Sequence, residues 1–191
     1  MAGSERAEGH ELLTRALDQS KHLVLVGMMG SGKSTNGRRC AERLGRPFHD
    51  ADALIEARAG RRIRDIFEHD GEPAFRALES DVLADLLALD EPSVIAGGGG
   101  IVLAAANRAL ARERGNVVWL RARPSTLVGR VNARTDRAGH RPLLDGDPAG
   151  QIARLADERR HLYEEVAHHV IDVDDLSPER VVTAIVELAG R

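Results

Sequence analysis

A glycine-rich segment, GMMGSGKS at residues 27–34, constrains this chain more than any other feature of its sequence. It satisfies the pattern G-x-x-x-x-G-K-[ST], follows the apolar residues 23–26 and leads into residues with helical patterning. A strand, a glycine loop and a helix in this order predict a phosphate-binding loop, because glycines let backbone N–H groups wrap around an anion at a helix N-terminus. The alternative is a glycine-rich turn with an incidental lysine.

In such a loop, the Lys33 ammonium group reaches the β- and γ-phosphates of a nucleotide, and the Ser34 hydroxyl group is a ligand of Mg²⁺. The other expected phosphate-binding residues are Gly30, Ser31, Gly32 and Thr35. The sequence lacks the N-K-x-D pattern that a GTPase carries for guanine. The third and fourth apolar runs end in VIAGGGG and VVWLRA, without the magnesium-binding aspartate of a motor ATPase.

The apolar runs predict an α/β fold. They occur at residues 23–26, 47–49, 93–96, 116–120 and 169–173, with helical patterning between them. Strands that alternate with helices indicate a mostly parallel sheet with helices on both faces. The chain has 191 residues, the size of a single domain, and its 42% hydrophobic content is enough to form one core.

Composition and charge exclude several classes of protein. The formal net charge of −3 gives no general attraction to nucleic acid or to an anionic membrane, so local arginines must bind any anionic ligand. No apolar run approaches the ~20 residues of a membrane-spanning helix. The single cysteine, Cys40, cannot form an intramolecular disulfide, and a reducing cytoplasm is the expected location.

Two carboxylates follow the second apolar run, in FHDADALIE. If the chain stays extended, Asp50 and Asp52 point to the same side at the carboxyl end of a parallel strand, where open α/β sheets bind their ligands. One carboxylate could join the Mg²⁺ shell, and the other could orient or deprotonate an acceptor hydroxyl group. The alternative is that the pair caps a helix that begins near Leu54.

Four consecutive glycines, residues 97–100, carry a large conformational-entropy cost. They indicate that the backbone approaches another group closely, although a tight turn between a strand and a helix is an alternative. A later segment, residues 134–150, is rich in Gly, Pro, Asp and Arg. It is either a solvated loop or a functional lid.

Together these segments resemble the shikimate kinase family, from about Leu23 to the C-terminus. In the order of the family, the segments are GMMGSGKST, FHDADALIE, FRALE, GGGIV, RTDRAGHRPLL, RRHLY and DVDDLSPE. The resemblance implies ATP-dependent phosphorylation of the 3-hydroxyl group of shikimate, in the biosynthesis of chorismate and aromatic amino acids. It also implies a three-layer α/β/α fold of the P-loop class, with a five-stranded parallel sheet in the order 2-3-1-4-5 and a mobile lid at about residues 134–150.

The resemblance also assigns roles to the matching residues. Lys33 and Ser34 hold phosphate and metal, Asp50 joins the Mg²⁺ shell, and Asp52 binds the substrate hydroxyl groups as the candidate base. The residues that would contact the acceptor, the transferred phosphate or the adenine are Arg76 and Arg159 at the acceptor carboxylate, Gly98, Gly99 and Gly100 lining the substrate, Arg141 on the lid and Arg134 near the adenine. Without the resemblance, Arg76 could be a solvated cation or could pair with Glu79 at i,i+3.

We therefore expect an extension with a short helix at residues 1–20 and one kinase domain at residues 21–191. We expect a cytoplasmic monomer that uses ATP, Mg²⁺ and shikimate and binds neither nucleic acid nor membrane. Two alternatives stay open: another small-molecule kinase of the same group, such as a gluconate kinase, and a module that binds ATP without phosphoryl transfer.

Overall fold

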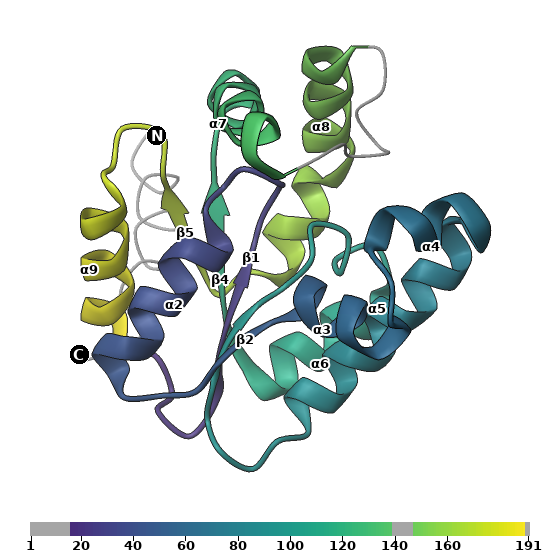
Figure 1. Ribbon diagram of the computed structural model, residues 1–191. Helices are drawn as coiled ribbons and strands as arrows, with labels where there is room; N and C mark the ends of the chain where they lie inside the picture. The colour runs from purple at the N-terminus through teal and green to yellow at the C-terminus, as the bar shows by residue number, and fades with distance from the viewer. Residues whose placement is uncertain (1–15, 139–146, 190–191) are drawn as a thin grey trace, which may run out of the picture.

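A parallel sheet forms the centre of the molecule, and helices cover both of its faces (Figure 1). The computed structural model describes residues 16–138 and 147–189. Within these residues five strands lie in the order β2-β3-β1-β4-β5, and every neighbouring pair is parallel. The predicted fold and strand order are confirmed. The strands are β1 (His22–Val26), β2 (Phe48–Asp50), β3 (Val94–Ala96), β4 (Gly115–Arg121) and β5 (His169–Asp172).

Each strand begins and ends within one residue of its predicted bounds. For β1, β3 and β4 the reason is that a strand buried on both faces has a nearly continuous apolar sequence. Successive side chains of the central strand β1 point to opposite faces of the sheet. Leu23 and Leu25 belong to one hydrophobic core, and Val24 and Val26 belong to the core on the opposite face of the sheet.

The helices divide between these two cores. Helices α2 (Lys33–Leu44) and α9 (Pro178–Ala189) pack together on one face. The other core takes residues from α3 (Ala51–Ala59), α4 (Ile63–His69), α5 (Gly71–Leu87), α6 (Ala105–Arg114), α7 (Pro124–Ala138) and α8 (Pro148–Val166). Figure 1 shows α7 and α8 beyond the end of β4, above the loop that joins β1 to α2.

The proposed extension and lid extend beyond the described residues. Leu17 is buried against α9, and its N–H group donates to the carbonyl of Leu188 at 2.8 Å. Residues 16–20 form no helix, and the rest of the segment in which the short helix was expected, residues 1–15, lies outside the described residues. The segment 134–150 begins in the last residues of α7 and ends in the first turn of α8, where the Asp147 side chain accepts from Gly150 N–H. Its middle, residues 139–146, lies outside the described residues.

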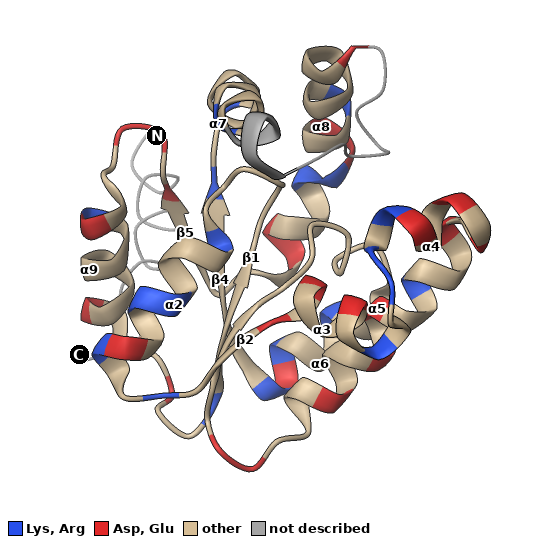
Figure 2. Cartoon of the chain, viewed as in Figure 1, with Lys and Arg blue, Asp and Glu red and all other residues tan. Residues whose placement is uncertain are grey.

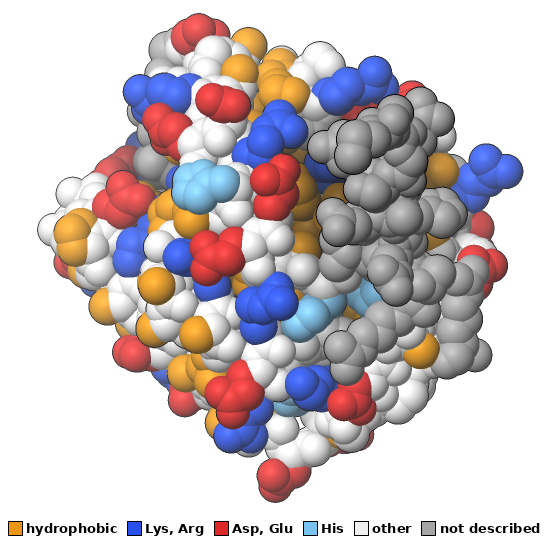
Figure 3. All heavy atoms as spheres, turned by 180° about the vertical axis from the view of Figure 1, so that it is seen from behind, with side chains coloured by type: hydrophobic (Ala, Val, Ile, Leu, Met, Phe, Trp, Pro, Cys, Tyr) orange, Lys and Arg blue, Asp and Glu red, His pale blue; other side chains and the backbone are white. Residues whose placement is uncertain are grey.

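The charged side chains are mixed in sign over the surface. Figure 2 shows acidic and basic positions interspersed on most helices, and Figure 3 shows the same mixture on the opposite side of the molecule. This agrees with the small net charge of −3. Among the residues that the structure describes, no helix combines the length and the apolar composition that crossing a membrane requires.

Candidate active site

The phosphate-binding loop turns sharply between β1 and α2. Gly27, Gly30 and Gly32 have φ angles of +144°, +82° and +93°, values that residues other than glycine rarely adopt. A Cβ atom on Gly27 would also lie 2.7 Å from the carbonyl oxygen of Leu120. The backbone conformation of the loop therefore requires glycine at these three positions of the sequence pattern. The loop ends with Gly32 at the N-cap of α2.

The predicted phosphate ligands lie in this loop and in the first turn of α2. The Lys33 ammonium group curls back over the loop and donates to the carbonyls of Gly27 at 2.8 Å and Met28 at 3.1 Å. The Ser31 hydroxyl group is buried and has no hydrogen-bond partner among the described residues. A flexible cation and a buried donor beside a helix N-terminus fit a nucleotide phosphate. Ser34 and Thr35 follow in the same turn.

The chain does not stay extended after Asp50, so of the two alternatives that the sequence left open the structure bears out helix capping, by Asp50. Helix α3 begins at Ala51, three residues before the predicted start near Leu54, and Asp50 is its N-cap. The Asp50 Oδ1 atom accepts from the N–H groups of Asp52 at 3.2 Å and Ala53 at 3.5 Å. Capping the exposed N–H groups of the first turn competes with the extended conformation and prevails here. Asp52 consequently projects from the first turn of a helix.

Residues 97–100 bring the parts of the site together. None of these four glycines has a positive φ angle, so the absence of a Cβ atom is what the site requires. A Cβ atom on Gly98 would collide with the Glu79 carboxylate and lie 2.9 Å from Asp52 Oδ1. On Gly100 it would collide with the Arg76 guanidinium group, and on Gly99 it would lie 3.7 Å from the backbone nitrogen of Met29 in the phosphate loop. The predicted close approach of this backbone is confirmed.

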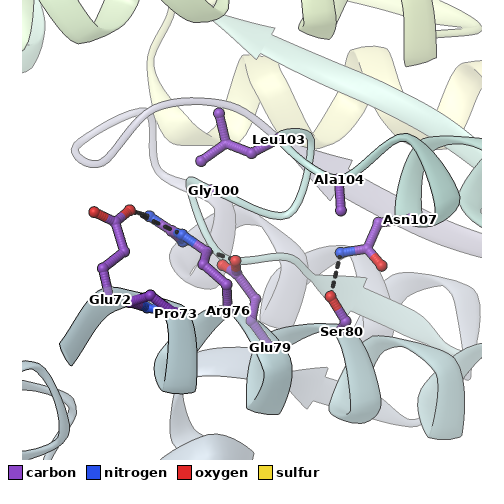
Figure 4. Close-up of a pocket in the computed structure, with 9 residues that line it drawn as sticks. All are labelled: Glu72, Pro73, Arg76, Glu79, Ser80, Gly100, Leu103, Ala104 and Asn107. Atoms are coloured by element: carbon purple, nitrogen blue, oxygen red, sulfur yellow. Dashed lines mark hydrogen bonds and ion pairs between the residues drawn. The ribbon is translucent and has the colours of Figure 1, made fainter. Parts of the chain in front are cut away.

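Arg76 is held between two carboxylates of its own helix (Figure 4). Its Nη1 atom donates to Glu79 Oε2 at 2.8 Å, which is the i,i+3 pair that the sequence offered as an alternative. Its Nε and Nη2 atoms donate to Glu72 Oε1 at 3.1 and 2.8 Å. The guanidinium group nevertheless lies against Gly100, so the ion pairs place Arg76 at the site and do not turn it toward solvent.

Arg159 reaches the same loop from α8. It is 5% exposed, and its Nη1 atom donates to the carbonyl of Gly99 at 3.1 Å. The hydroxyl group of Tyr163, one turn later, donates to this carbonyl at 2.6 Å. Burial raises the pKa of the Tyr163 hydroxyl, which therefore stays protonated and donates its hydrogen at physiological pH.

Glu79 is a member of the site to which the sequence interpretation gave no role beyond a possible partner of Arg76. Its side chain is 2% exposed, and burial raises the pKa of its carboxyl group, while Arg76 lowers it. The Asp52 carboxylate raises this pKa as well, and Arg159 lowers it. Helical spacing in the sequence could have identified Glu79 as a neighbour of Arg76, because the two residues lie at i,i+3 in FRALE. In the same way, Tyr163 lies at i,i+4 from Arg159 in RRHLY.

The donors present fit Mg²⁺ bound together with a nucleotide. In the described part of the chain, no three His, Cys, Asp or Glu side chains form a metal site by themselves. Mg²⁺ commonly takes one or two protein oxygens and completes its shell with phosphates and waters. Ser34 and Asp50 would supply these oxygens, and the helix-cap bonds of Asp50 involve Oδ1 alone.

Two predicted residues cannot be placed in this arrangement. Arg141 lies outside the described residues, and Arg134 lies in α7, but its side chain is outside the described part of the structure. Their roles at the transferred phosphate and near the adenine stay predictions.

The fold and this site define a P-loop kinase of small molecules. The sequence model of the shikimate kinase family matches residues 29–189 of this chain. A shikimate kinase from Symbiobacterium thermophilum is 50% identical over 167 residues, which cover 87% of this chain and 94% of that protein. The structure of a shikimate kinase from Acinetobacter baumannii in complex with shikimate has 38% identity and a TM-score of 0.82, over 88% of this chain and 92% of that one.

This chain belongs to the shikimate kinase family, and it is a kinase that uses ATP and Mg²⁺. A gluconokinase from Sinorhizobium meliloti covers 91% of this chain and 94% of its own with a TM-score of 0.50, but its 20% identity shows the common fold alone. Membership of the family therefore decides against the two alternatives that the sequence left open, a gluconate kinase and a non-catalytic module.

Proposed function

We propose that this chain transfers the γ-phosphoryl group of ATP to the 3-hydroxyl group of shikimate and produces shikimate 3-phosphate and ADP. One observation carries the proposal: residues 98–100 touch the phosphate loop, Asp52, Arg76 and Arg159. A molecule bound against this backbone is therefore next to a phosphate seat, a carboxylate and two guanidinium groups. These are the groups that phosphoryl transfer to an anionic alcohol needs.

The two arginines bind the acceptor by its carboxylate. A guanidinium group matches a carboxylate with two parallel N–H donors, and the pairing is stronger where water is excluded. Arg159 is buried, and the Arg76 side chain is 21% exposed. Because these residues approach from α8 and α5, they fix the acceptor from two directions and direct its hydroxyl group toward the phosphate loop.

Asp52 receives the proton in the transfer step. A bond forms between the acceptor oxygen and the γ-phosphorus, while the bond from that phosphorus to the β,γ-bridging oxygen breaks and ADP leaves with the electron pair. The hydroxyl proton passes to the Asp52 carboxylate, which lies beside Gly98. The Lys33 ammonium group, which lies over the phosphate loop, binds the nucleotide phosphates. Ser34 and Asp50 would hold Mg²⁺, which would neutralise negative charge on the nucleotide phosphates.

We also propose that the enzyme acts as a cytoplasmic monomer without nucleic acid or membrane partners. On the side of the molecule that Figure 3 shows, the described side chains of both signs are mixed and form no broad basic face for a polyanion.

The Asp52→Asn variant tests the mechanism. It keeps the shape of the side chain and removes its charge, so we expect kcat to fall about 10²–10⁴-fold while ATP binding is unchanged. The assay measures ADP release with shikimate, with gluconate and with no acceptor. Asp65→Asn is the matched control, because Asp65 is also an acid in the first turn of a helix, on α4. Turnover of Asp52→Asn within about threefold of the parent would contradict the base role, and preference for gluconate would contradict the acceptor.

A further inference from the structure

The carboxylate of Glu72 occupies the Nε/Nη2 edge of Arg76, one of the two edges along which a guanidinium group binds a carboxylate. A guanidinium group can bind a carboxylate with two N–H donors along its Nε/Nη2 edge or its Nη1/Nη2 edge, and both edges use Nη2. In this structure, Nη2 and Nε both donate to Glu72 Oε1, at 2.8 and 3.1 Å (Figure 4). Because Nη2 carries two N–H hydrogens, one for each edge, an acceptor carboxylate that binds along the Nε/Nη2 edge must displace Glu72.

The two carboxylates on Arg76 differ in how readily they can leave. The Glu79 side chain is 2% exposed, and without Arg76 it would be a buried charge without its main partner. The Glu72 side chain is 50% exposed, so water can solvate its carboxylate as soon as it leaves. Exposed i,i+4 ion pairs are weak. Glu79 is therefore a permanent partner of Arg76, and Glu72 is an exchangeable one.

The surroundings give a displaced Glu72 room and an electrostatic reason to move. A pocket of about 370 Å³ lies between α5 and the start of α6, and it borders Glu72, Arg76 and Gly100. The two arginines of the site already face the carboxylates of Glu72, Glu79 and Asp52. A fourth carboxylate, from the acceptor, would add repulsion unless Glu72 moves away from the guanidinium group.

We propose that Glu72 is an internal competitor of the acceptor carboxylate for the Nε/Nη2 edge of Arg76. An anionic acceptor displaces it, whereas a neutral acceptor cannot compete with a charged carboxylate for the guanidinium group. Glu72 thus lowers the affinity for an anionic acceptor and leaves the affinity for an uncharged analogue, which does not displace it, unchanged. The inference rests on the proposed role of Arg76 as a ligand of the acceptor carboxylate.

A purely structural role for Glu72 makes the opposite prediction. Glu72 is an acid in the first turn of α5, where a negative charge stabilises the helix N-terminus. If this were its only role, Glu72→Gln would lower the melting temperature and leave acceptor binding unchanged. It would weaken acceptor binding if Glu72 instead positioned Arg76 for the acceptor. A competitor for Arg76 increases affinity when its charge is removed and does so only while Arg76 is present, whereas simple charge repulsion would persist without Arg76.

Calorimetric titration of shikimate into Glu72→Gln, Arg76→Ala and the double variant tests the proposal. We expect Glu72→Gln to lower the Kd for shikimate about two- to fivefold, with no change in ATP affinity. In the Arg76→Ala background, Glu72→Gln should have no effect, because the contested donor is gone. Arg76→Lys, which keeps a cation beside Glu79, replaces Arg76→Ala if the alanine variant fails to fold.

Two controls separate a local effect from a general one. Glu68→Gln removes the same charge from another i,i+4 pair with an arginine, on α4, and should not change the Kd for shikimate. The analogue of shikimate with a neutral hydroxymethyl group should bind equally to the parent and to Glu72→Gln. Equal tightening by Glu68→Gln, or of the neutral analogue, would overturn the proposal.

The outcomes also distinguish this inference from the proposed function. If Arg76→Ala binds shikimate as tightly as the parent does, Arg76 is not a carboxylate ligand and the proposed function loses its support. If Arg76→Ala weakens binding while Glu72→Gln leaves it unchanged or weaker, the acceptor subsite stands and the competitor role of Glu72 is overturned.

Discussion

Tyr163 connects three parts of the site through one hydroxyl group. It donates to the carbonyl of Gly99 at 2.6 Å and lies 3.7 Å from the sulfur of Met28, in the phosphate loop. Its ring stacks on Trp119 at 5.5 Å between centroids. Because Arg159 donates to the same carbonyl, Tyr163 fixes both the loop that lines the acceptor and the arginine that holds it. This makes Tyr163 a positioning residue.

Tyr163→Phe should therefore affect the acceptor more than the nucleotide. The variant removes one hydrogen bond, worth about 0.5–1.5 kcal/mol, and keeps the aromatic packing. We expect the KM for shikimate to rise about two- to tenfold while the KM for ATP stays the same. Steady-state kinetics at varied concentrations of each substrate measure both. Trp119→Phe is the control, because it disturbs the aromatic packing but not the hydrogen bonds to the Gly99 carbonyl; it should lower the melting temperature and leave the KM for shikimate unchanged. If Tyr163→Phe changes the KM for ATP as much as the KM for shikimate, the positioning role is refuted.

Among the helices, strands and loops, the sequence predicted those whose conformation depends on residues that are neighbours in the chain. The strands and the phosphate loop depend on apolar patterning and on the backbone freedom of glycine, which neighbouring residues determine. The start of α3 was predicted three residues late, because Asp50 caps the helix and the sequence offers capping and extension equally. The contacts of residues 97–100 with α3, α5 and α8 could not be predicted from spacing, since they join segments distant in the chain.

The loop at residues 97–100 gives an element-scale prediction. Gly98→Ala places a methyl group against the carboxylates of Glu79 and Asp52, and overpacking of this kind costs about 1–3 kcal/mol. We expect kcat/KM for shikimate to fall about tenfold or more, with the Kd for ATP within about twofold of the parent. Gly129→Ala is the control: the helix position is open, so alanine there should raise stability and leave activity intact. A Gly98→Ala enzyme with parental kcat/KM would show that this backbone does not confine the acceptor.

At the scale of the whole molecule, two buried histidines make stability depend on pH. His22, at the start of β1, and His169, at the start of β5, are each 5% exposed, and burial lowers the pKa of both below 6.5. The His22 Nδ1 atom accepts from Ser93 N–H at 3.1 Å, a bond that joins β1 to the approach of β3 and that protonation would break. Glu79 acts in the opposite sense, because its pKa is raised by burial and its contribution to stability decreases as the pH rises.

The sign for the histidines follows from proton binding in the two states. Between the lowered pKa of the folded state and 6.5, the unfolded chain binds more protons, so the free energy of unfolding decreases as the pH falls through this window. His22→Asn keeps an acceptor for Ser93 and removes the titration. From urea unfolding at pH 7, 6 and 5, we expect its loss of stability toward acid to be smaller than that of the parent, by at most about 1.4 kcal/mol per pH unit. Glu79 and His169 are common to both proteins, so the difference isolates His22. His161→Asn, at an exposed position on α8, should follow the parent, and parallel profiles for His22→Asn and the parent would show that His22 does not drive the acid sensitivity.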